Sequence, residues 1–415
     1  MVSIMPSKPP SLVQLLRAQP ALRRVVAIRV ADELGAQMLN VAIGWYVYAT
    51  TGDAMSLAYV GLAQFAPNLG LALVAGHVAD RVDRRAVVGL SLLVQTLSLA
   101  GFAAWAVDAS ASVWPVYALL VALGAARAFF FPAMAALLPQ VVGAADFPRA
   151  VAAAASAGQL CAIAGPAVGG AAYAVAGAGT FVGVAALYGL ATLQAWRLAG
   201  GRRAAAPVSS DPADRSLLAG LRAVRANRLL LGLISLDLVA VLLGGVTALL
   251  PIFARDILAI GPAGLGALRC APGVGAALVG LVLAHRAIAR DAGRVMLGCV
   301  AGFGLAIVLF ALSRTLWLSL VALAVAGGFD MVSMVIRHTL LQTATPDALR
   351  GRVGAVAGLF VAASSELGEF ESGVTAALFG AMPAALLGGL ATVAAVVLWR
   401  RWFPELRRAD RSADA

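Results

Sequence analysis

The sequence predicts an all-α membrane protein with about twelve transmembrane helices, and three observations support this prediction. Of the 415 residues, 61% are hydrophobic and only 12% are charged. The mean hydropathy of +0.91 is typical of a chain that lies mostly within a bilayer. About twelve apolar stretches are each long enough to cross a hydrocarbon core about 30 Å thick.

These apolar stretches follow one another through almost the whole chain. An even number of spans puts both chain ends on the same side of the membrane. The predicted spans are residues 25–50, 55–76, 86–107, 113–137, 150–177, 179–199, 229–254, 264–284, 295–313, 316–337, 353–379 and 382–399.

The arginines indicate the orientation of these spans. They concentrate in alternate loops, in the middle segment from Arg202 to Arg228, and in the C-terminal tail. The positive-inside rule therefore predicts that both termini and the middle segment face the cytoplasm of a bacterial-type inner membrane. This topological role accounts for the formal net charge of +11 without a nucleic-acid partner.

The chain is expected to consist of two six-helix halves. The Gly-, Pro- and Arg-containing segment 200–228 begins as a linker and ends as a basic amphipathic helix for the inner leaflet. A shift of about 204 residues pairs Gly76 with Gly280, and similar matches elsewhere favour a parallel duplication. The predicted parts are a cytoplasmic N-terminal segment (1–24), two halves (25–199 and 229–403), the linker (200–228) and a cytoplasmic tail (404–415).

Charged residues inside the spans are the strongest functional signal. Such groups are costly in a bilayer unless they face a wet cavity or a partner, so they predict a polar path typical of a transporter. They are Arg29, Asp32, Glu33, Arg127, Asp237, Arg269, Asp330, Glu366, Glu369 and Glu371. Carboxylates in such a cavity are suited to proton exchange.

We expect the first-helix acids to carry protons. Arg29 and Glu33 are four residues apart on one helix face, so an ion pair is the alternative role, which leaves Asp32 as the freer carboxylate. Asp237 stands at the equivalent position of the second half. Arg127 could neutralise Asp237, neutralise Asp330, or anchor an anionic substrate.

The eleventh span offers a further pair of candidates for the proton site. Glu366 and Glu369 are three residues apart and would repel each other if both were ionised, so one of them is expected to hold a proton. Packing between helices is the alternative role of these glutamates.

Several other functions are excluded or disfavoured. A nucleotide-driven pump needs a phosphate-binding loop with a lysine, and the only lysine is Lys8. His285 and Asp291 share no helix face, so we expect no enzyme. The cysteines lack metal-ligand spacing, and neither a metal site nor a cofactor is expected. Cys161, Cys270 and Cys299 are expected to be small buried residues.

The expected partners are a small-molecule substrate, protons and the lipid bilayer, and the expected state is a monomer.

The loop after the second span contains the most specific motif, made of Gly76, Asp80, Arg81, Arg84 and Arg85. Its spacing resembles the signature loop of the major facilitator superfamily, which has glycine where this chain has Asp83. Gly76, just before this tight turn, is expected to let two helices approach closely. The resemblance implies that Asp80 and Arg84 hold an inner gate against the start of the eleventh span, near Arg352.

A second motif lies in the fifth span, where GPAVGG contains Gly165, Pro166, Gly169 and Gly170. It resembles the proton-antiporter signature of drug and siderophore exporters, in which glycine and proline allow bending and close packing. FFFPAMAALLPQVV and LLQTATPDALRGRVGAV resemble the macrolide-efflux and enterobactin-exporter branch of the same superfamily.

The resemblance to this branch implies a major facilitator fold with twelve helices in two pseudo-repeats. It also implies alternating access and proton-driven export of small, amphiphilic, drug- or siderophore-like molecules. A metabolite importer or facilitator, and a membrane receptor or assembly protein without transport, are the alternatives.

Overall fold

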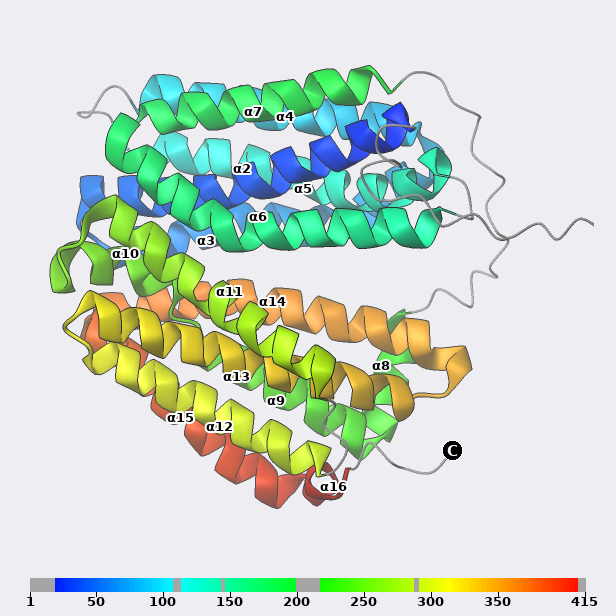
Figure 1. Ribbon diagram of the computed structural model, residues 1–415, viewed down its shortest axis with the longest axis vertical. Coiled ribbons are helices and arrows are strands. Elements are labelled where there is room, and N and C mark those ends of the chain that lie inside the picture. Colours follow the sequence, from blue (N-terminus) through cyan, green and yellow to red (C-terminus); the bar gives the residue numbers. More distant parts are fainter. Residues whose placement is uncertain (1–18, 107–112, 143–145, 199–216, 287–290, 410–415) are drawn as a thin grey trace, which may run out of the picture. The chain divides into compact units, whose positions relative to one another are not determined.

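The computed structural model describes residues 19–106, 113–142, 146–198, 217–286 and 291–409. Every regular element within these ranges is a helix (Figure 1). The elements are α2 (Pro20–Thr51), α3 (Ala54–Arg81), α4 (Arg84–Trp105), α5 (Trp114–Val141), α6 (Phe147–Ala176), α7 (Gly179–Trp196), α8 (Leu217–Ala226), α9 (Arg228–Gly244), the 3-10 turn η2 (Thr247–Leu249), α10 (Leu250–Ile252), the π turn η3 (Phe253–Ile257), α11 (Gly261–His285), α12 (Ala292–Leu312), α13 (Leu316–Thr343), α14 (Asp347–Phe379), α15 (Ala381–Trp402) and α16 (Pro404–Arg408).

Long helices occupy all the predicted spans. Among the described residues, nine helical stretches are long and apolar enough to cross a membrane, and one of them runs from α9 through η3. Helices α2, α3 and α7 coincide with the other three predicted spans. The all-α membrane fold is thus confirmed, whereas the number twelve stays a prediction for these three helices.

Packing groups the chain into two units, and α2, α3 and α6 each contribute residues to both. Unit 1 contains Met1–Leu39, Ala66–Gly165 and Ala178–Ala206. Unit 2 contains Asn40–Phe65, Pro166–Gly177 and Pro207–Ala415. The two predicted sequence halves, 25–199 and 229–403, stay a prediction.

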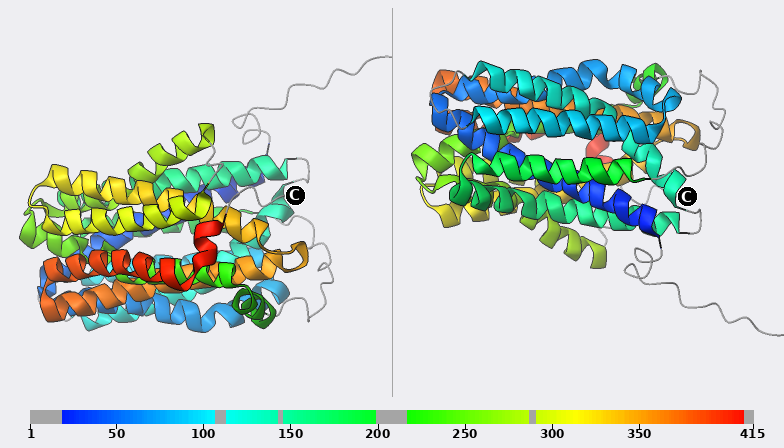
Figure 2. Two further views of the ribbon diagram at one scale, coloured as in Figure 1. Left: turned by 90° about the horizontal axis from the view of Figure 1, so that it is seen from below. Right: turned by 90° about the horizontal axis from the view of Figure 1, so that it is seen from above.

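In unit 1, α4 lies beside both α5 and α7 (Figures 1 and 2). Phe102 of α4 packs on Phe181 of α7, with ring centroids 4.4 Å apart. At the other end of this helix pair, a Cβ atom on Gly89 would lie 3.3 Å from the Trp196 ring, so the small residue makes room for a large one. These contacts hold α7 against the rest of unit 1.

In unit 2, α12 packs between α13 and α15, and α11 packs on α13 (Figures 1 and 2). The α11–α13 contact is close because glycines form it. A Cβ atom on Gly275 would overlap the carbonyl of Ala324, and one on Gly327 would overlap that of Pro272. Such small-residue packing is the usual way in which membrane helices associate.

Helix α8 confirms the predicted amphipathic helix before the second half. Val224 and Gly220 are buried, and a Cβ atom on Gly220 would lie 2.7 Å from the Arg352 carbonyl of α14. Arg222 and Arg225 are exposed on the other face. Helix α8 therefore packs its apolar face on α14 and turns its arginines outward.

The predicted span 229–254 lies within the membrane-length stretch Arg228–Ile257, but its helix is interrupted. Helix α9 ends at Gly244, and Gly245 separates it from the short elements η2, α10 and η3. Two consecutive glycines weaken the helix, and Pro251 lacks an N–H donor. The Ser372 hydroxyl of α14 donates to the Gly245 carbonyl at 2.5 Å, which satisfies a backbone group that the break exposes.

Candidate functional site

Unit 2 contains a cavity of about 320 Å³ beside the break in α9. We name it the acidic cavity, because its charged lining residues are Asp237, Asp330, Glu369 and a single arginine, Arg337. Apolar side chains form most of the remaining wall, including Phe303, Ile307, Phe329 and Met334. A mostly apolar wall with a few polar groups is typical of small-molecule sites.

The most buried charges of the acidic cavity form an ion pair between α9 and α13. Arg337 donates through Nη1 to Oδ1 of Asp237, and the two residues are only 8% and 6% exposed. The pair is held between packed helices, so neither charge can move into bulk water when its partner is lost. Within unit 2, Arg337 is therefore the partner of Asp237.

Sequence reasoning overlooked Arg337 because it stands at the end of a predicted span. A signal was present, since Asp330 and Arg337 are seven residues apart and so share one face of α13. Ser333 and Met334 lie between them on the same face and also line the cavity. Charges spaced by two helical turns thus mark the cavity-lining face of this helix.

The other two carboxylates of the acidic cavity have different surroundings. Asp330 is exposed along the cavity wall. Glu369 of α14 interacts electrostatically with Arg269 of α11, whose Nε atom is buried without a hydrogen-bond partner in the described structure. Among the described residues, the cavity thus contains one ion-paired carboxylate, Asp237, and two carboxylates that form no short ion pair.

The structure separates the three glutamates of α14. Glu369 lines the acidic cavity. Glu366 is half-buried and is not one of the described cavity-lining residues, and Glu371 accepts a hydrogen bond from Thr375 on its own helix at 2.7 Å. Of the predicted pair Glu366 and Glu369, only Glu369 is therefore among the described residues that line the acidic cavity.

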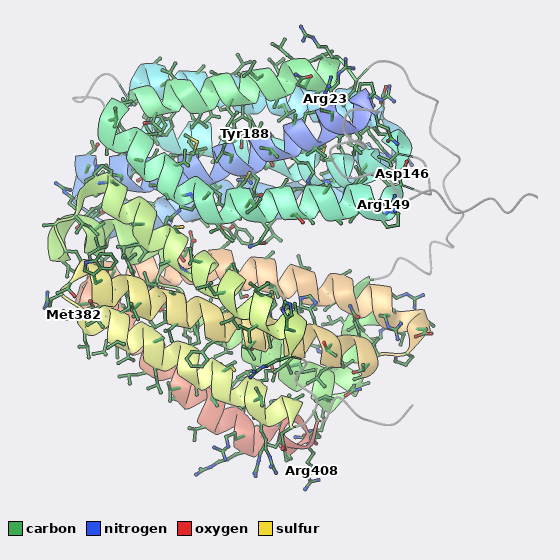
Figure 3. The ribbon with its side chains drawn as sticks, viewed as in Figure 1. Arg23, Asp146, Arg149, Tyr188, Met382 and Arg408 are labelled. Carbon is green, nitrogen blue, oxygen red and sulfur yellow. The ribbon has the colours of Figure 1, made fainter. Side chains whose placement is uncertain are left out.

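In unit 1, Asp32 is buried, and the sequence did not indicate its partner, Tyr188, which Figure 3 labels. The Tyr188 hydroxyl of α7 donates to the Asp32 carbonyl at 3.1 Å and to its Oδ1 at 3.3 Å. A Cβ atom on Gly35 would lie 2.5 Å from the Tyr188 ring, so this glycine provides the space for the tyrosine. The expectation that Asp32 is the freer acid is wrong.

The neighbouring charges of unit 1 are also arranged differently from the prediction. Gln37 donates to Oε1 of Glu33 at 2.9 Å, and among the residues described here Arg29 and Glu33 form no ion pair. Arg127 lies over the Phe131 ring at 5.4 Å and, like Arg29, interacts electrostatically with Asp32. Arg29 and Arg127 are thus both near enough to Asp32 to act on its charge. This role of Arg127 was not among the three that the sequence suggested.

The signature loop between α3 and α4 is tied to unit 1 by its arginines. Arg84 donates to the Ala136 carbonyl of α5 at 3.3 Å, and Arg85 donates to the Leu198 carbonyl at 3.2 Å. Asp83 accepts from the Arg85 backbone N–H at 3.0 Å and so caps α4, which explains a carboxylate where the resembled signature has glycine.

Among the described residues, the predicted close helix approach at Gly76 is not found, and the predicted gate contact of Asp80 is untested. A Cβ atom on Gly76 would meet nothing within 4 Å, so the described structure has no close helix approach at this glycine. Arg81 is exposed. The Asp80 side chain lies outside the described residues, and its contact near Arg352 stays a prediction.

The GPAVGG motif packs as its glycines predict. A Cβ atom on Gly165 would lie 2.6 Å from Gln37 of α2, and one on Gly170 would lie 2.5 Å from the Pro262 carbonyl of α11. Gly170 and Gly266 therefore face each other where α6 meets α11. Helix α6 continues through Pro166, and Gly169 is buried.

We expect Gly170→Val to destabilise the protein by about 1–3 kcal/mol, because the new side chain overlaps the backbone of α11. Gly158→Val is the matched control on the same helix, since a Cβ atom there meets nothing within 4 Å. Thermal unfolding in detergent measures both variants. Equal unfolding midpoints would show that the α6–α11 contact is looser than the structure indicates.

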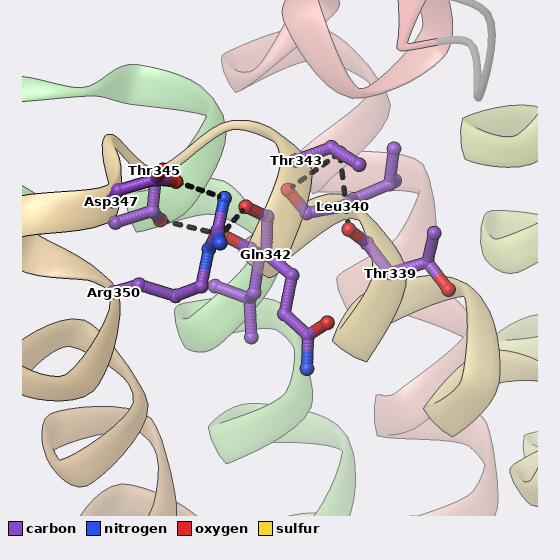
Figure 4. A network of polar contacts seen from close by, with 8 residues as sticks. Thr339, Leu340, Gln342, Thr343, Thr345, Asp347 and Arg350 are labelled. Atoms are coloured by element: carbon purple, nitrogen blue, oxygen red, sulfur yellow. Dashed lines mark hydrogen bonds and ion pairs between the residues drawn. The ribbon is translucent and has the colours of Figure 1, made fainter.

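A second cavity of about 330 Å³ lies between α13 and α14 and shares Arg337 and Val361 with the acidic cavity. We name it the basic cavity, because its other ionisable lining residues are His338 and Arg350. Figure 4 shows that Arg350 is fixed by Asp347 at 2.6 Å and by the Gln342 carbonyl at 3.2 Å. Arg337 thus stands between an acidic and a basic compartment.

Long apolar helices around a cavity with buried charges define a polytopic membrane transporter. The match to the Major Facilitator Superfamily covers residues 26–369. The chain belongs to this superfamily.

Characterised relatives lie in the branch that the sequence motifs resemble. The chain is 29% identical over 394 residues to the enterobactin exporter EntS of Escherichia coli O139:H28 (strain E24377A / ETEC), and the match covers 91% of this chain and 87% of the relative. EntS of Shigella boydii serotype 18 (strain CDC 3083-94 / BS512) gives the same identity and coverage. The exporter-like branch is therefore confirmed.

Solved structures of other transporters share the fold. A bacterial homolog of the human lysosomal transporter Spinster has a TM-score of 0.70 at 15% identity, covering 97% of this chain and 99% of that one. The nucleoside transporter NupG has a TM-score of 0.70 at 13% identity, with coverage of 92% and 99%. The POT family transporter PepTSo has a TM-score of 0.72 at 11% identity, with coverage of 94% and 99%.

Proposed function

We propose that this protein is a secondary active transporter that exports small amphiphilic molecules by proton antiport. The observation that carries the proposal is the buried Asp237–Arg337 pair at the wall of a cavity that Asp330 and Glu369 also line. A proton-coupled carrier needs carboxylates that are shielded from bulk water yet reachable through a cavity. The acidic cavity meets both requirements.

The ion pair provides a way to couple protons to substrate. When Asp237 is ionised, it neutralises Arg337. When Asp237 binds a proton, its carboxylate loses its charge and no longer attracts a hydrogen-bond donor or cationic group of the substrate. Proton and substrate thus compete for the same carboxylate, which is the thermodynamic requirement for antiport.

The walls of the acidic cavity support an amphiphilic, drug- or siderophore-like substrate. Phe303 and Phe329 offer aromatic faces to an apolar or catechol-like ring, and Ser333 offers a hydroxyl. The similarity to the enterobactin exporter supports the same class. Solved relatives of the fold include nucleoside and peptide transporters, so import is the alternative direction.

Flux in proteoliposomes tests direction and coupling together. Enterobactin and the dye rhodamine 6G are added outside vesicles whose lumen is acidic, and protein-free vesicles correct for passive trapping. An antiporter accumulates substrate in the acidic lumen, and a protonophore abolishes the accumulation. Accumulation driven by an alkaline lumen would identify a proton-coupled importer, and no flux under either gradient would identify a receptor or assembly protein.

The arginine distribution supports an orientation with both termini and residues 202–228 in the cytoplasm. We expect a reporter fused after Ala415 to be active only on the cytoplasmic side. Activity in the periplasm instead would reverse the proposed topology.

A further inference from the structure

At one end of unit 2, three arginines from three different helices converge on a single pocket. The pocket measures about 240 Å³, and Arg294 of α12, Arg400 of α15 and Arg407 of α16 line it. No acidic residue is among its described lining residues. The pocket lies outside the acidic and basic cavities and shares no lining residue with them.

Backbone contacts join two of the helices that carry these arginines, α12 and α16. The Gly293 N–H at the start of α12 donates to the Ala409 carbonyl at 3.1 Å. A Cβ atom on Gly293 would overlap the Leu406 carbonyl, and Leu406 is fully buried. Helix α16 is thus fixed against α12, which keeps Arg407 on the same pocket as Arg294.

Nearby acids leave most of this positive charge uncompensated. Asp291 pairs with Arg294 at 3.1 Å, but both side chains are more than half exposed, so solvent screens the pair. Glu405 pairs with Arg228 at 3.5 Å. In the described part of the chain, Arg400 and Arg407 take part in no ion pair.

The rest of the pocket is apolar and follows the same helices away from the charges. Leu297 and Ala301 stand one and two turns after Arg294 on the same face of α12, and Val396 stands one turn before Arg400 on α15. Both helices are long and apolar enough to span a membrane. The pocket therefore presents a cationic end and an apolar wall in the order of a lipid headgroup and its acyl chain.

We propose that this pocket binds the phosphodiester headgroup of an anionic membrane lipid, with Arg294, Arg400 and Arg407 on the phosphate and Leu297, Ala301 and Val396 along the start of an acyl chain. Arginine forks suit phosphate oxygens, and basic pockets between the ends of membrane helices suit anionic headgroups. The site is independent of the transported substrate and of the direction of transport.

Binding to the full-length protein in a neutral maltoside detergent tests the proposal. The probes are dihexanoyl-phosphatidylglycerol, the zwitterionic dihexanoyl-phosphatidylcholine and inorganic phosphate, and calorimetry gives their Kd values. We expect dihexanoyl-phosphatidylglycerol to bind more tightly than dihexanoyl-phosphatidylcholine or inorganic phosphate. Arg400→Gln with Arg407→Gln should weaken it about thirtyfold, because each arginine near an anionic headgroup contributes about one kcal/mol.

Two controls separate the lipid site from general charge effects. The double variant Arg401→Gln with Arg408→Gln removes the same charge from the same two helices outside the pocket lining and should leave the Kd unchanged (Figure 3 labels Arg408). Gly298→Leu fills the pocket without a clash, because a Cβ atom on Gly298 meets nothing within 4 Å, and should weaken lipid binding but not phosphate binding.

The other outcomes overturn the proposal. Equal Kd values for the two lipids, or equal losses in both double variants, would mean that the pocket selects no anionic headgroup. Phosphate binding as tight as lipid binding, unaffected by Gly298→Leu, would assign the pocket to a soluble anion. Because the three arginines are exposed, the variants are expected to fold, and their unfolding midpoints without lipid check this.

Discussion

Replacing Asp237 with alanine is expected to destabilise the protein by about 3–5 kcal/mol, because Arg337 is then left as a buried charge without its partner. Arg337→Met alone should be costly for the same reason, since it leaves Asp237 buried and unpaired. The double variant Asp237→Ala with Arg337→Met should recover most of the loss, because no buried charge remains. Thermal unfolding in detergent, arranged as a double-mutant cycle, measures these effects.

An exposed ion pair in the same unit provides the matched control. The side chains of Arg350 and Asp347 are 50% and 89% exposed, so the corresponding cycle should give a coupling energy of about 1 kcal/mol or less. If the Asp237 and Arg337 variants are simply additive, the two side chains do not form a buried pair. The coupling route proposed through Asp237 would then lose its structural basis.

Asp32→Asn is expected to abolish gradient-driven export while substrate binding and downhill exchange persist. The neutral side chain cannot carry a proton, yet it retains the size of the original and can still accept a hydrogen bond from Tyr188. Uptake of enterobactin into acidic-lumen proteoliposomes measures the loss, and exchange without a gradient measures what persists. Glu33→Gln tests the second acid of this helix in the same way.

Tyr188→Phe is the control that separates proton transfer from packing. It removes the hydroxyl that donates to Asp32 and keeps both the ring beside Gly35 and the carboxylate. Coupling should survive in this variant. If Asp32→Asn, Glu33→Gln and the double variant of Asp32→Asn with Asp237→Asn all still concentrate substrate, the coupling carboxylate should be sought at Glu369.

The fold was predictable because bilayer thickness and hydropathy strongly constrain helix length and position. The break after Gly244 was harder to predict, because its stability depends on a distant hydroxyl: Ser372 satisfies the Gly245 carbonyl. The cap at Asp83 was missed for a different reason. Its residue type was read only as a departure from the family signature, although an aspartate is a good helix N-cap.

The candidate site was predictable in its residue types more than in its pairings. Charges such as Asp32 and Asp237 stand out inside apolar helices, but their partners Tyr188 and Arg337 lie about 100 or more residues away in sequence. Tertiary packing alone brings such residues together. Tyr188 carries no charge, so a search for charged groups in the spans could not select it.

Proton release on substrate binding tests the central claim that protons and substrate compete for the same carboxylates of the protein. Enterobactin is added to the purified protein in weakly buffered detergent solution near neutral pH, and a pH-sensitive dye reports released protons. The account predicts proton release from the wild-type protein, a smaller release from Asp32→Asn or Asp237→Asn, and little from the double variant. Saturable binding of enterobactin to the wild-type protein without proton release would contradict proton-coupled export.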